Sequence, residues 1–441
     1  MGLGRYGTFT GGIDLPEEKN ATLAARIRPC EPPERLRVPL ATGSGPPAEP
    51  CVAVGESVRA SQRIATACNG GVDVFAPLGG RVAAFGWIAT ARGERFVESP
   101  AVELTDLRPP PETPETPERV FDWSSAEPDE LARRIADGAL VTHRPRPVPL
   151  ARWLAGARRR RCRTLVANVV EHEPYVTADH RVLAEFGPEV IEGLAILAKA
   201  IGSAEVVLAV DRRRTGFYAG SIDAAERFGV ARIALPHKYP IGADTILAKV
   251  LTRRETPPGA ETTSVGTAIL DAATCRAVFR WVCHGLRAIA RVVTVAGARA
   301  GEARNLLVPF GADCHSLGDF GDAMVLHGGP MAGLACPAEA VVTPATAAVL
   351  ALEASPRPVP TACIRCGWCT DHCPARLNVS ALNDAFELSL VDDARRGGAA
   401  ACVRCGVCSY VCPARLPLMY RVQQLKRWIL AAASDPDSET P

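Results

Sequence analysis

Apolar runs of strand length alternate with segments of helical periodicity in the middle of the chain. The strand-like runs are TLVANVV (164–170), EVVLAV (205–210) and VARIALP (230–236). The segments whose apolar spacing is typical of amphipathic helices are 128–135, 188–201 and 222–228. Because buried strands that alternate with helices form parallel sheets, this pattern predicts an α/β domain.

A different pattern flanks this region on both sides. Between residues 35 and 106 the short runs CVAVGESV, VFAPLGG and RVAAFGWIA are separated by Gly and Pro, which predicts strands joined by tight turns. Between 291 and 335 the runs RVVTVAG, NLLVPFG and AMVLHGG predict a second small β or α+β module. A last helix is expected over 420–432.

These changes of pattern predict four structured regions and one linker. We expect an N-terminal β module over 1–107 and a linker over 108–122, which includes RPPPETPETP. The α/β domain follows over 123–285, the second β module over 286–350, and a cysteine-rich region over 351–441. The fold class is therefore multidomain α/β and α+β.

Composition and charge narrow the class of protein. The chain has 441 residues, of which 47% are hydrophobic, and a formal net charge of +2. This charge gives no argument for a nucleic-acid partner, and we expect none. We find neither a signal-peptide pattern at the N-terminus nor an apolar run long enough to span a bilayer. A cytoplasmic protein is expected, which would reach a membrane only by docking to other proteins.

The cysteines are unevenly distributed. Eight of the 16 are scattered and are interpreted as small buried apolar residues, and eight lie between positions 363 and 412. The crowded eight form two copies of C-x-x-C-x-x-C-x-x-x-C-P. The first copy comprises Cys363, Cys366, Cys369 and Cys373, and the second comprises Cys402, Cys405, Cys408 and Cys412. Crowding of this kind indicates metal ligands and not a disulfide framework.

The spacing is that of the bacterial ferredoxin run, which binds two [4Fe-4S] clusters with crossed ligation. In that pattern the fourth cysteine of each copy ligates the cluster of the other copy. We therefore predict a first cluster on Cys363, Cys366, Cys369 and Cys412, and a second cluster on Cys402, Cys405, Cys408 and Cys373. A pair of zinc sites is the alternative, but zinc needs only four ligands in a compact site, and the duplicated three-plus-one pattern exceeds that need.

Upstream of the cysteines, several segments carry a resemblance to a known family. They are GGIDLPEEK (11–19), PAEPCVAVGESV, APLGGRVAAF, NVVEHEPYVTADHR (168–181), HKYPIGADTIL (237–247) and HGGPMAG (327–333). In this order and spacing they resemble the RnfC (RsxC) family of the Rnf electron-transport complex along nearly the whole chain. The resemblance implies a barrel-sandwich module, an α/β domain similar to the flavin-bearing subunit of respiratory complex I, a β-grasp (SLBB) ligand-binding module and a ferredoxin-like domain with two clusters.

The resemblance also implies an activity and partners. The Rnf complex transfers electrons between NADH and ferredoxin in a translocase that moves ions across a membrane. Its RnfC member would lie on the cytoplasmic face of the inner membrane, bound to other subunits, and would exchange electrons with ferredoxin or another redox protein. A soluble flavoprotein that resembles the cobalamin reductase of propanediol-utilising microcompartments is the alternative, but that family typically lacks the N-terminal module.

The chain departs from the family at the loop expected to hold the FMN phosphate. Arg144, Pro145, Arg146 and Pro147 stand where glycines would present backbone N–H groups, and proline has no N–H to donate. Asp271 replaces an asparagine and would repel a phosphate. These residues argue against an FMN site of ordinary geometry. The sequence therefore leaves open whether the chain itself oxidises NADH or only relays electrons.

Four residues remain candidate cofactor contacts by the resemblance: Asn168, Glu171, Glu173 and Lys238. The alternative is that Glu173-Pro174-Tyr175 and Lys238-Tyr239-Pro240 only shape turns. No catalytic residue is predicted. A third interpretation, a binding module with vestigial clusters, is disfavoured because all eight cysteines are intact.

Overall fold

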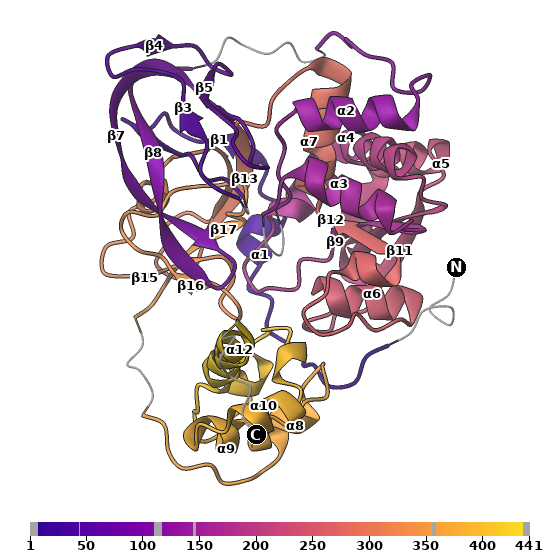
Figure 1. Cartoon of the computed structure of the whole chain (residues 1–441), viewed down its shortest axis with the longest axis vertical. Coiled ribbons are helices and arrows are strands. Elements are labelled where there is room, and N and C mark those ends of the chain that lie inside the picture. Colours follow the sequence, from indigo (N-terminus) through magenta and orange to yellow (C-terminus); the bar gives the residue numbers. More distant parts are fainter. Residues whose placement is uncertain (1–7, 44, 110–116, 144–146, 355–358, 435–441) are drawn as a thin grey trace.

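The computed structural model describes residues 8–43, 45–109, 117–143, 147–354 and 359–434. Three lobes are visible in Figure 1: a β lobe at the upper left, an α/β lobe at the upper right and a small helical lobe below both. The expected multidomain α/β and α+β architecture is confirmed. Residues 110–116 of the expected linker and 144–146 of the expected phosphate loop lie outside the described residues.

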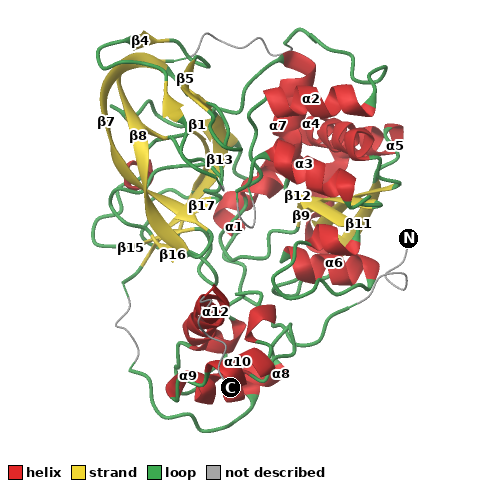
Figure 2. Cartoon of the chain, in the orientation of Figure 1, coloured by secondary structure: helices red, strands yellow, loops and turns green. Residues whose placement is uncertain are grey.

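The α/β lobe is built on a parallel sheet of four strands in the order β11-β10-β9-β12. Its strands are β9 (Thr164–Val169), β10 (Glu205–Asp211), β11 (Ala231–Leu235) and β12 (Thr267–Leu270). Helices cover both faces of the sheet (Figure 2). One face packs against α2 (Pro128–Asp137), α3 (Leu150–Arg159), α4 (Ala178–Ile201), α5 (Ile222–Arg227) and α7 (Ala272–His284), and the other packs against α6 (Asp244–Thr252).

The burial of both faces explains why the strand sequences are continuously apolar. In β9, Leu165 and Ala167 belong to the core beneath α4 and α7, whereas Val166 belongs to the core beneath α6. A strand buried on both faces needs no polar alternation. The predicted strands and helices of this domain are confirmed, although the helix expected over 188–201 begins ten residues earlier. Its first part is separated by a non-helical residue, Phe186, two positions before Pro188.

The β lobe contains three sheets. The barrel-like part has β2 (Leu36–Pro39), β4 (Ser57–Val58), β7 (Gly79–Arg92) and β8 (Arg95–Arg108), beside a small sheet of β3 (Glu49–Pro50), β5 (Arg63–Thr66) and β6 (Val74–Phe75). The six-stranded sheet has the order β1-β14-β13-β17-β15-β16. Its strands are β1 (Ile27–Pro29), β13 (Ala290–Ala296), β14 (Arg304–Pro309), β15 (Met324–His327), β16 (Leu334–Ala335) and β17 (Ala348–Leu352).

The barrel and the six-stranded sheet share one hydrophobic core. Leu36, Ile64 and Leu104 of the barrel pack in the same cluster as Val293 and Val308 of the sheet. The expectation of three similar strands in the barrel was wrong in detail. Most of CVAVGESV forms turns with only two residues in β4, whereas RVAAFGWIA lies inside the 14-residue β7. The β7–β8 hairpin is long because each strand pairs along its length with the other.

The helical lobe holds all eight clustered cysteines. It consists of α8 (Trp368–Asp371), α9 (Val379–Glu387), α10 (Val391–Arg396), α11 (Val407–Tyr410) and α12 (Leu418–Ser434), with the last helix close to its expected place. Short 3-10 helices complete the chain: η2 (Arg212–Ser221), η3 (Thr262–Val265), η4 (Cys314–Leu317) and η5 (Ala399–Ala401). One further helix, α1 (Asn20–Leu23), lies between the upper lobes (Figure 1).

Candidate functional site

The two cysteine motifs fold into two copies of one local structure. Each cysteine of the first motif is followed by its counterpart 39 positions later, and α8 and α9 recur as α11 and α12 with the same offset. The backbone repeats too, because Arg365 and Arg404 have φ of 56° and 57°, and Gly367 and Gly406 have φ of 81° and 78°. Left-handed residues between ligands turn the chain tightly around one point. The spacing in the sequence is therefore realised as two equivalent loops.

The first cavity of the helical lobe brings together cysteines from both motifs. Its lining includes Cys363, Cys366 and Cys369 of the first motif and Cys412 of the second. The Cys369 thiol senses the same neighbours, because burial raises its pKa and the thiols of Cys412 and Cys366 add to that effect. This grouping is the one that crossed ligation requires.

The remaining four cysteines form a second group. Burial is the main reason that the pKa of Cys405 rises to about 12, and the neighbouring thiols of Cys402 and Cys373 contribute to the rise. Burial likewise raises the pKa of Cys408, with contributions from Cys402, Cys405 and Cys373. Cys373 thus lies with the second motif although it belongs to the first in sequence. The ligand assignment itself remains a prediction.

The spacing of the thiols fits clusters better than single ions. Four sulfurs around one zinc ion at about 2.3 Å lie within about 4 Å of one another. In the part of the chain that the structure describes, no three cysteine sulfurs lie within 4.8 Å of one another. Each group therefore surrounds a wider space than a tetrahedral ion fills. A four-iron cluster, which holds its cysteines farther apart, suits that space.

Backbone N–H groups point at the sulfurs of the second group. Arg404 N donates to Cys402 Sγ at 3.4 Å, and Leu377 N donates to Cys373 Sγ at the same distance. Such N–H···S bonds stabilise negative charge on the thiolates and are one of the factors that set the reduction potential of a bound cluster. The left-handed conformation of Arg404 is what turns its N–H toward Cys402.

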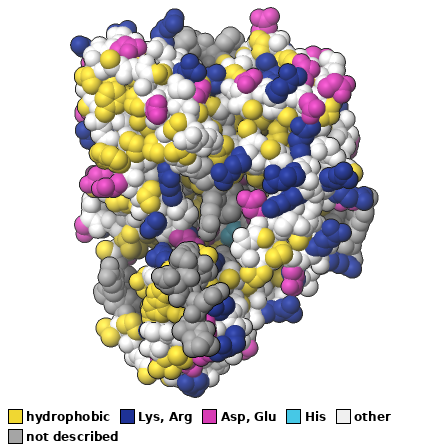
Figure 3. Space-filling view, in the orientation of Figure 1, with side chains coloured by type: hydrophobic (Ala, Val, Ile, Leu, Met, Phe, Trp, Pro, Cys, Tyr) yellow, Lys and Arg dark blue, Asp and Glu magenta, His cyan; other side chains and the backbone are white. Residues whose placement is uncertain are grey.

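The two groups differ in their surroundings. Cys366 of the first group is exposed, and its neighbours Ile364 and Trp368 are 66% and 53% exposed. Hydrophobic side chains are also visible on the helical lobe at the bottom of Figure 3. An exposed apolar surface beside a redox centre is the kind of surface that contacts another protein.

The second group instead faces the two upper lobes. Arg404 donates to the carbonyl oxygens of Gly93 at 3.1 Å and Ala332 at 2.5 Å. Gly406 lies so close to the backbone of Met331 that a Cβ at that position would be 2.5 Å from the Met331 oxygen. The loop of the second motif is therefore fixed to the β lobe on one side, and Tyr239 of the α/β lobe contacts it on the other.

The segment GGIDLPEEK threads between the lobes. Gly12 N donates to the carbonyl of His372 at 2.8 Å, and Ile13 exchanges hydrogen bonds with Tyr239 at 3.0 and 2.9 Å. Gly11 has φ of 70° and lies against the Cys373 backbone, where a Cβ would be only 2.7 Å away. Only glycine suits this position, because it combines a left-handed conformation with a close backbone approach. The segment thus connects the helical lobe to the α/β lobe.

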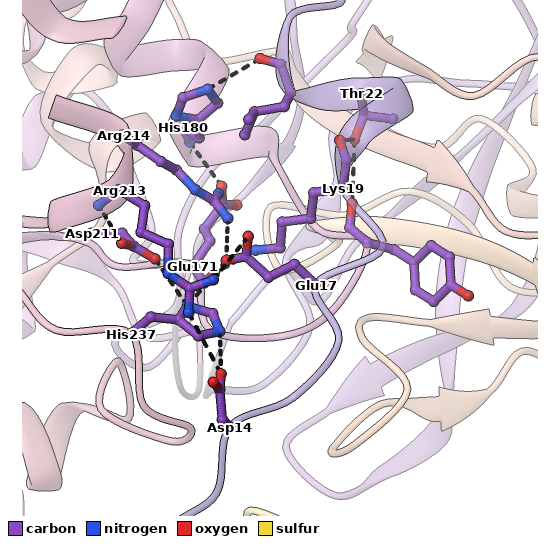
Figure 4. Close-up of polar contacts among 12 residues, drawn as sticks. Asp14, Glu17, Lys19, Thr22, Glu171, His180, Asp211, Arg213, Arg214 and His237 are labelled. Atoms are coloured by element: carbon purple, nitrogen blue, oxygen red, sulfur yellow. Dashed lines mark hydrogen bonds and ion pairs between the residues drawn. The ribbon is translucent and has the colours of Figure 1, made fainter. Parts of the chain in front are cut away.

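Charged groups hold the same segment over the carboxyl ends of β10 and β11 (Figure 4). Glu17 accepts from Arg214 Nη2 at 2.7 Å and lies 3.0 Å from His237 Nδ1. His237 Nδ1 is also 3.0 Å from Asp211 Oδ2. Although burial alone would raise the pKa of Asp211, its hydrogen bonds from His237 and Arg213 N lower it. These contacts form an ion-pair cluster that closes this edge of the sheet.

Ligand-type atoms of Glu17, Asp211 and His237 lie within 4.8 Å of one another, a spacing that could hold a metal ion. Two guanidinium groups, however, already supply positive charge there, because Arg214 bonds to Glu17 and Arg213 lies 3.6 Å from it. A divalent cation would be repelled by both. We therefore interpret these residues as a structural ion-pair cluster.

The described residues of the loop expected to hold FMN are bonded to one another. Thr142 N donates to Val148 O at 2.9 Å, Val148 N donates to Thr142 Oγ1 at 3.1 Å, and Leu150 N donates to Leu140 O at 2.8 Å. A phosphate cradle needs such N–H groups unoccupied and converging. These amides do not fit an FMN phosphate, and we derive no step through FMN.

Two of the predicted cofactor contacts have structural partners beside this loop. Asn168 Nδ2 donates to Gly242 O and to Asp244 Oδ1, both at 2.9 Å. The two oxygens of Glu171 accept from the backbone N–H groups of Asp179 and His180 at 2.9 and 2.8 Å, so Glu171 caps the start of α4. Asp271 similarly caps α7 by accepting from Thr274 N at 2.7 Å. A cofactor role for Asn168 and Glu171 remains a prediction.

The other two predicted contacts face the neighbouring segments. Lys238 Nζ donates to Phe9 O at 2.9 Å and lies 4.4 Å from the centre of the Phe9 ring. Glu173 accepts from Met331 N at 3.0 Å and lies 3.0 Å from Tyr239 Oη. The structure thus brings Glu173 and Tyr239 together at the second cysteine group. The sequence had suggested only that Tyr239 shapes a turn, because no local pattern reveals a contact with Cys405.

Two buried histidines predict the pH dependence of stability. Burial lowers the pKa of His180 and of His327 to about 4. Since an unfolded histidine takes up a proton near pH 6.5, the unfolded state binds more protons below that pH. Stability should be highest above pH 6.5 and fall as the pH drops from about 6.5 to about 4, by on the order of 3 kcal/mol for each histidine.

The measurement is the unfolding midpoint between pH 5 and 8 for the native chain and for His327→Gln. His327 Nε2 bonds to Thr346 Oγ1 at 2.9 Å, and the glutamine amide can keep that contact without titrating. The variant should lose less stability on acidification than the native chain. Equal slopes for the two proteins would contradict the assignment of this proton to His327.

Comparison with known families assigns three regions of the chain. A family model described as the RnfC barrel sandwich hybrid domain matches residues 7–105, and one described as the Nuo51 FMN-binding domain matches 148–280. A third, described as a 4Fe-4S dicluster domain, matches residues 355–418. The match over the barrel favours the Rnf resemblance over the cobalamin-reductase alternative. The chain therefore carries a dicluster domain of the [4Fe-4S] type.

Full-length relatives complete the comparison. The RnfC protein of the ion-translocating oxidoreductase complex of Rhodobacter capsulatus is 33% identical over 95% of this chain and 82% of its own length. The chain belongs to the RnfC family. The corresponding proteins from Serratia proteamaculans and Pseudomonas aeruginosa are each 31% identical and cover 85% and 86% of this chain. This RnfC family member spans only 54% and 51% of their lengths.

Solved structures add a partial likeness. An NAD+-reducing [NiFe]-hydrogenase in the H2-reduced state covers 74% of this chain and 66% of its own, with 17% identity and a TM-score of 0.49. Within the described residues, none of the helices has the length and apolar character needed to cross a membrane. Both findings are compatible with membership of the RnfC family, and neither extends it.

Proposed function

We propose that this RnfC family member is an iron–sulfur electron carrier in an ion-translocating oxidoreductase complex. Crossed ligation would place one cluster on Cys363, Cys366, Cys369 and Cys412, and the other on Cys402, Cys405, Cys408 and Cys373. Each cluster, when bound, accepts and releases an electron. All eight ligand positions are cysteines, so neither cluster has an open iron for substrate chemistry. The chain itself therefore relays electrons.

The observation that carries this proposal is the different environment of the two cysteine groups. The second group is held against the α/β and β lobes, whereas the first opens to the surface beside Ile364 and Trp368. Two centres placed in this way connect the inside of the protein to its outside. A redox partner such as ferredoxin would contact the exposed group, and the second group would exchange electrons with a donor or acceptor on the side of the upper lobes.

The rest of the assembly follows from the family. The relatives are named as subunits of an ion-translocating complex, so other subunits of such a complex are the proposed binding partners. Docked to them, the chain would be peripheral on the cytoplasmic face of the inner membrane. NADH would be the source or the sink of electrons. We propose that no FMN is held in the ordinary geometry in this chain, because the described amides of the expected loop are bonded internally.

The test is cofactor analysis of the full chain after anaerobic reconstitution. We expect iron and labile sulfide for two four-iron clusters, two electron paramagnetic resonance signals on reduction, and no stoichiometric FMN. Stoichiometric zinc without labile sulfide, in protein purified anaerobically, would overturn the electron-carrier proposal. Stoichiometric FMN that NADH bleaches would overturn only the part that concerns the flavin.

A further inference from the structure

A tyrosine of the α/β lobe reaches the backbone of a predicted cluster ligand. Tyr239 is only 1% exposed, and its Oη lies 2.7 Å from the carbonyl oxygen of Cys405. Its position follows from the fold, because the turn after β11 points it toward the helical lobe, and its main chain is held by Ile13 on both N–H and C=O. Leu15, Val407 and Met331 pack around it. The hydroxyl therefore has little freedom to choose another partner.

The hydroxyl also lies 3.0 Å from Oε1 of Glu173, whose Oε2 accepts from Met331 N at 3.0 Å. A tyrosine hydroxyl carries one hydrogen, and a peptide carbonyl can only accept. Both contacts of Oη are satisfied at once only if the Glu173 carboxyl carries a proton and donates it to Oη. Burial, which raises the pKa of Glu173, favours that state. The hydrogen bonds then run from Glu173 to Tyr239 and from Tyr239 to Cys405.

The far side of the Cys405 loop is fixed as well. Arg404 is bonded to Gly93 and Ala332, and Gly406 is packed against Met331. The hydroxyl dipole therefore acts on a peptide that does not move away from it. The equivalent cysteine of the first motif, Cys366, is exposed to solvent. The repeated motifs thus place the same ligand in two different electrostatic settings.

We propose that Tyr239 is a positioning residue that raises the reduction potential of the second cluster, and that Glu173 orients its hydroxyl by donating a hydrogen bond. This inference rests on the proposed function, since it requires a cluster on Cys405. The positive end of the O–H dipole points at a ligand peptide, which favours the added electron of the reduced state. Hydrogen bonding around the ligands and exclusion of solvent are known determinants of such potentials.

The experiment is a redox titration of the reconstituted full-length chain, followed by electron paramagnetic resonance. In Tyr239→Phe, one of the two midpoints should become more negative, and the other should stay in place. A tenfold change in the reduction equilibrium, which is about 59 mV for one electron, is the expected size. The phenylalanine ring fills the same space, so the lobe contact should survive, and near-native iron content in this variant would verify it.

Glu173→Gln is the matched variant. Its amide can donate to Tyr239 Oη and accept from Met331 N, as the protonated acid does, so both midpoints should stay close to those of the native chain. Unchanged midpoints in Tyr239→Phe, or equal shifts of both midpoints, would overturn the role of Tyr239. A shift in Glu173→Gln as large as that in Tyr239→Phe would overturn the donor role of Glu173. Failure of the native chain to bind two clusters would instead be a failure of the proposed function.

Discussion

Replacing Cys412 with alanine should remove the first cluster and leave the second intact, although Cys412 lies in the second motif. Its thiol lines the cavity formed by Cys363, Cys366 and Cys369, so its loss opens a corner of that site. A four-iron cluster that loses one of its thiolates is expected to be lost, and the iron content should fall to about half that of two clusters. Iron and sulfide analysis of the anaerobically reconstituted chain measures this directly.

Double variants separate crossed from uncrossed ligation. Cys366→Ala with Cys412→Ala should keep about half of the iron, because both ligands serve the same cluster. Cys366→Ala with Cys373→Ala should lose nearly all of it, because those ligands serve different clusters. Uncrossed ligation predicts the reverse ranking. Cys51→Ala, which changes an exposed cysteine outside the motifs, is the control and should bind as much iron as the native chain.

The second large effect concerns the packing of α4 against α7. Gly193 lies inside α4 at the point where the two helices are in closest contact, and a Cβ there would be 1.9 Å from the carbonyl oxygen of Cys275. Gly193→Ala must push the helices apart or strain α7. Overpacking of a core usually costs about 1–3 kcal/mol, and a contact with rigid backbone belongs at the upper end of that range.

Thermal unfolding followed by circular dichroism measures this effect, and the chain offers a close control. Gly156 lies inside α3, and a Cβ at that position has no neighbour within 4 Å. Gly156→Ala should therefore stabilise the protein slightly, by about 0.5–1 kcal/mol, since alanine favours a helix interior. If the two variants unfold at the same temperature, the close approach at Gly193 does not limit stability.

Local sequence patterns predicted much of the α/β lobe. The run TLVANVV reads as a strand because both of its faces are buried, and Asp137-Gly138 marks the end of α2, where the structure ends it. The two cysteine motifs could be recognised because the ligands of an iron–sulfur cluster impose a fixed spacing on a short stretch of chain. Information of this kind lies within a few residues.

Contacts between distant segments could not be predicted in that way. β1 is a three-residue strand that pairs with β14, more than 270 positions later, and nothing in IRP distinguishes it from a loop. Glu171 was predicted as a cofactor contact from its motif, and only the structure shows that it caps α4. The bond between Tyr239 and Cys405 likewise depends on how two lobes meet, which no periodicity records.

The path of the N-terminal segment has a consequence for biosynthesis. Residues 11–29 are made first, yet their partners are Tyr239, β14 and His372, which leave the ribosome hundreds of residues later. The segment must stay unpaired while the lobes between them form, because a domain generally folds as it emerges. Its last contact, from Gly12 to His372, can close only when the first cysteine motif has been translated. Completion of the upper lobes and readiness of the cysteines for metal insertion are therefore tied to the same late moment in the life of the chain.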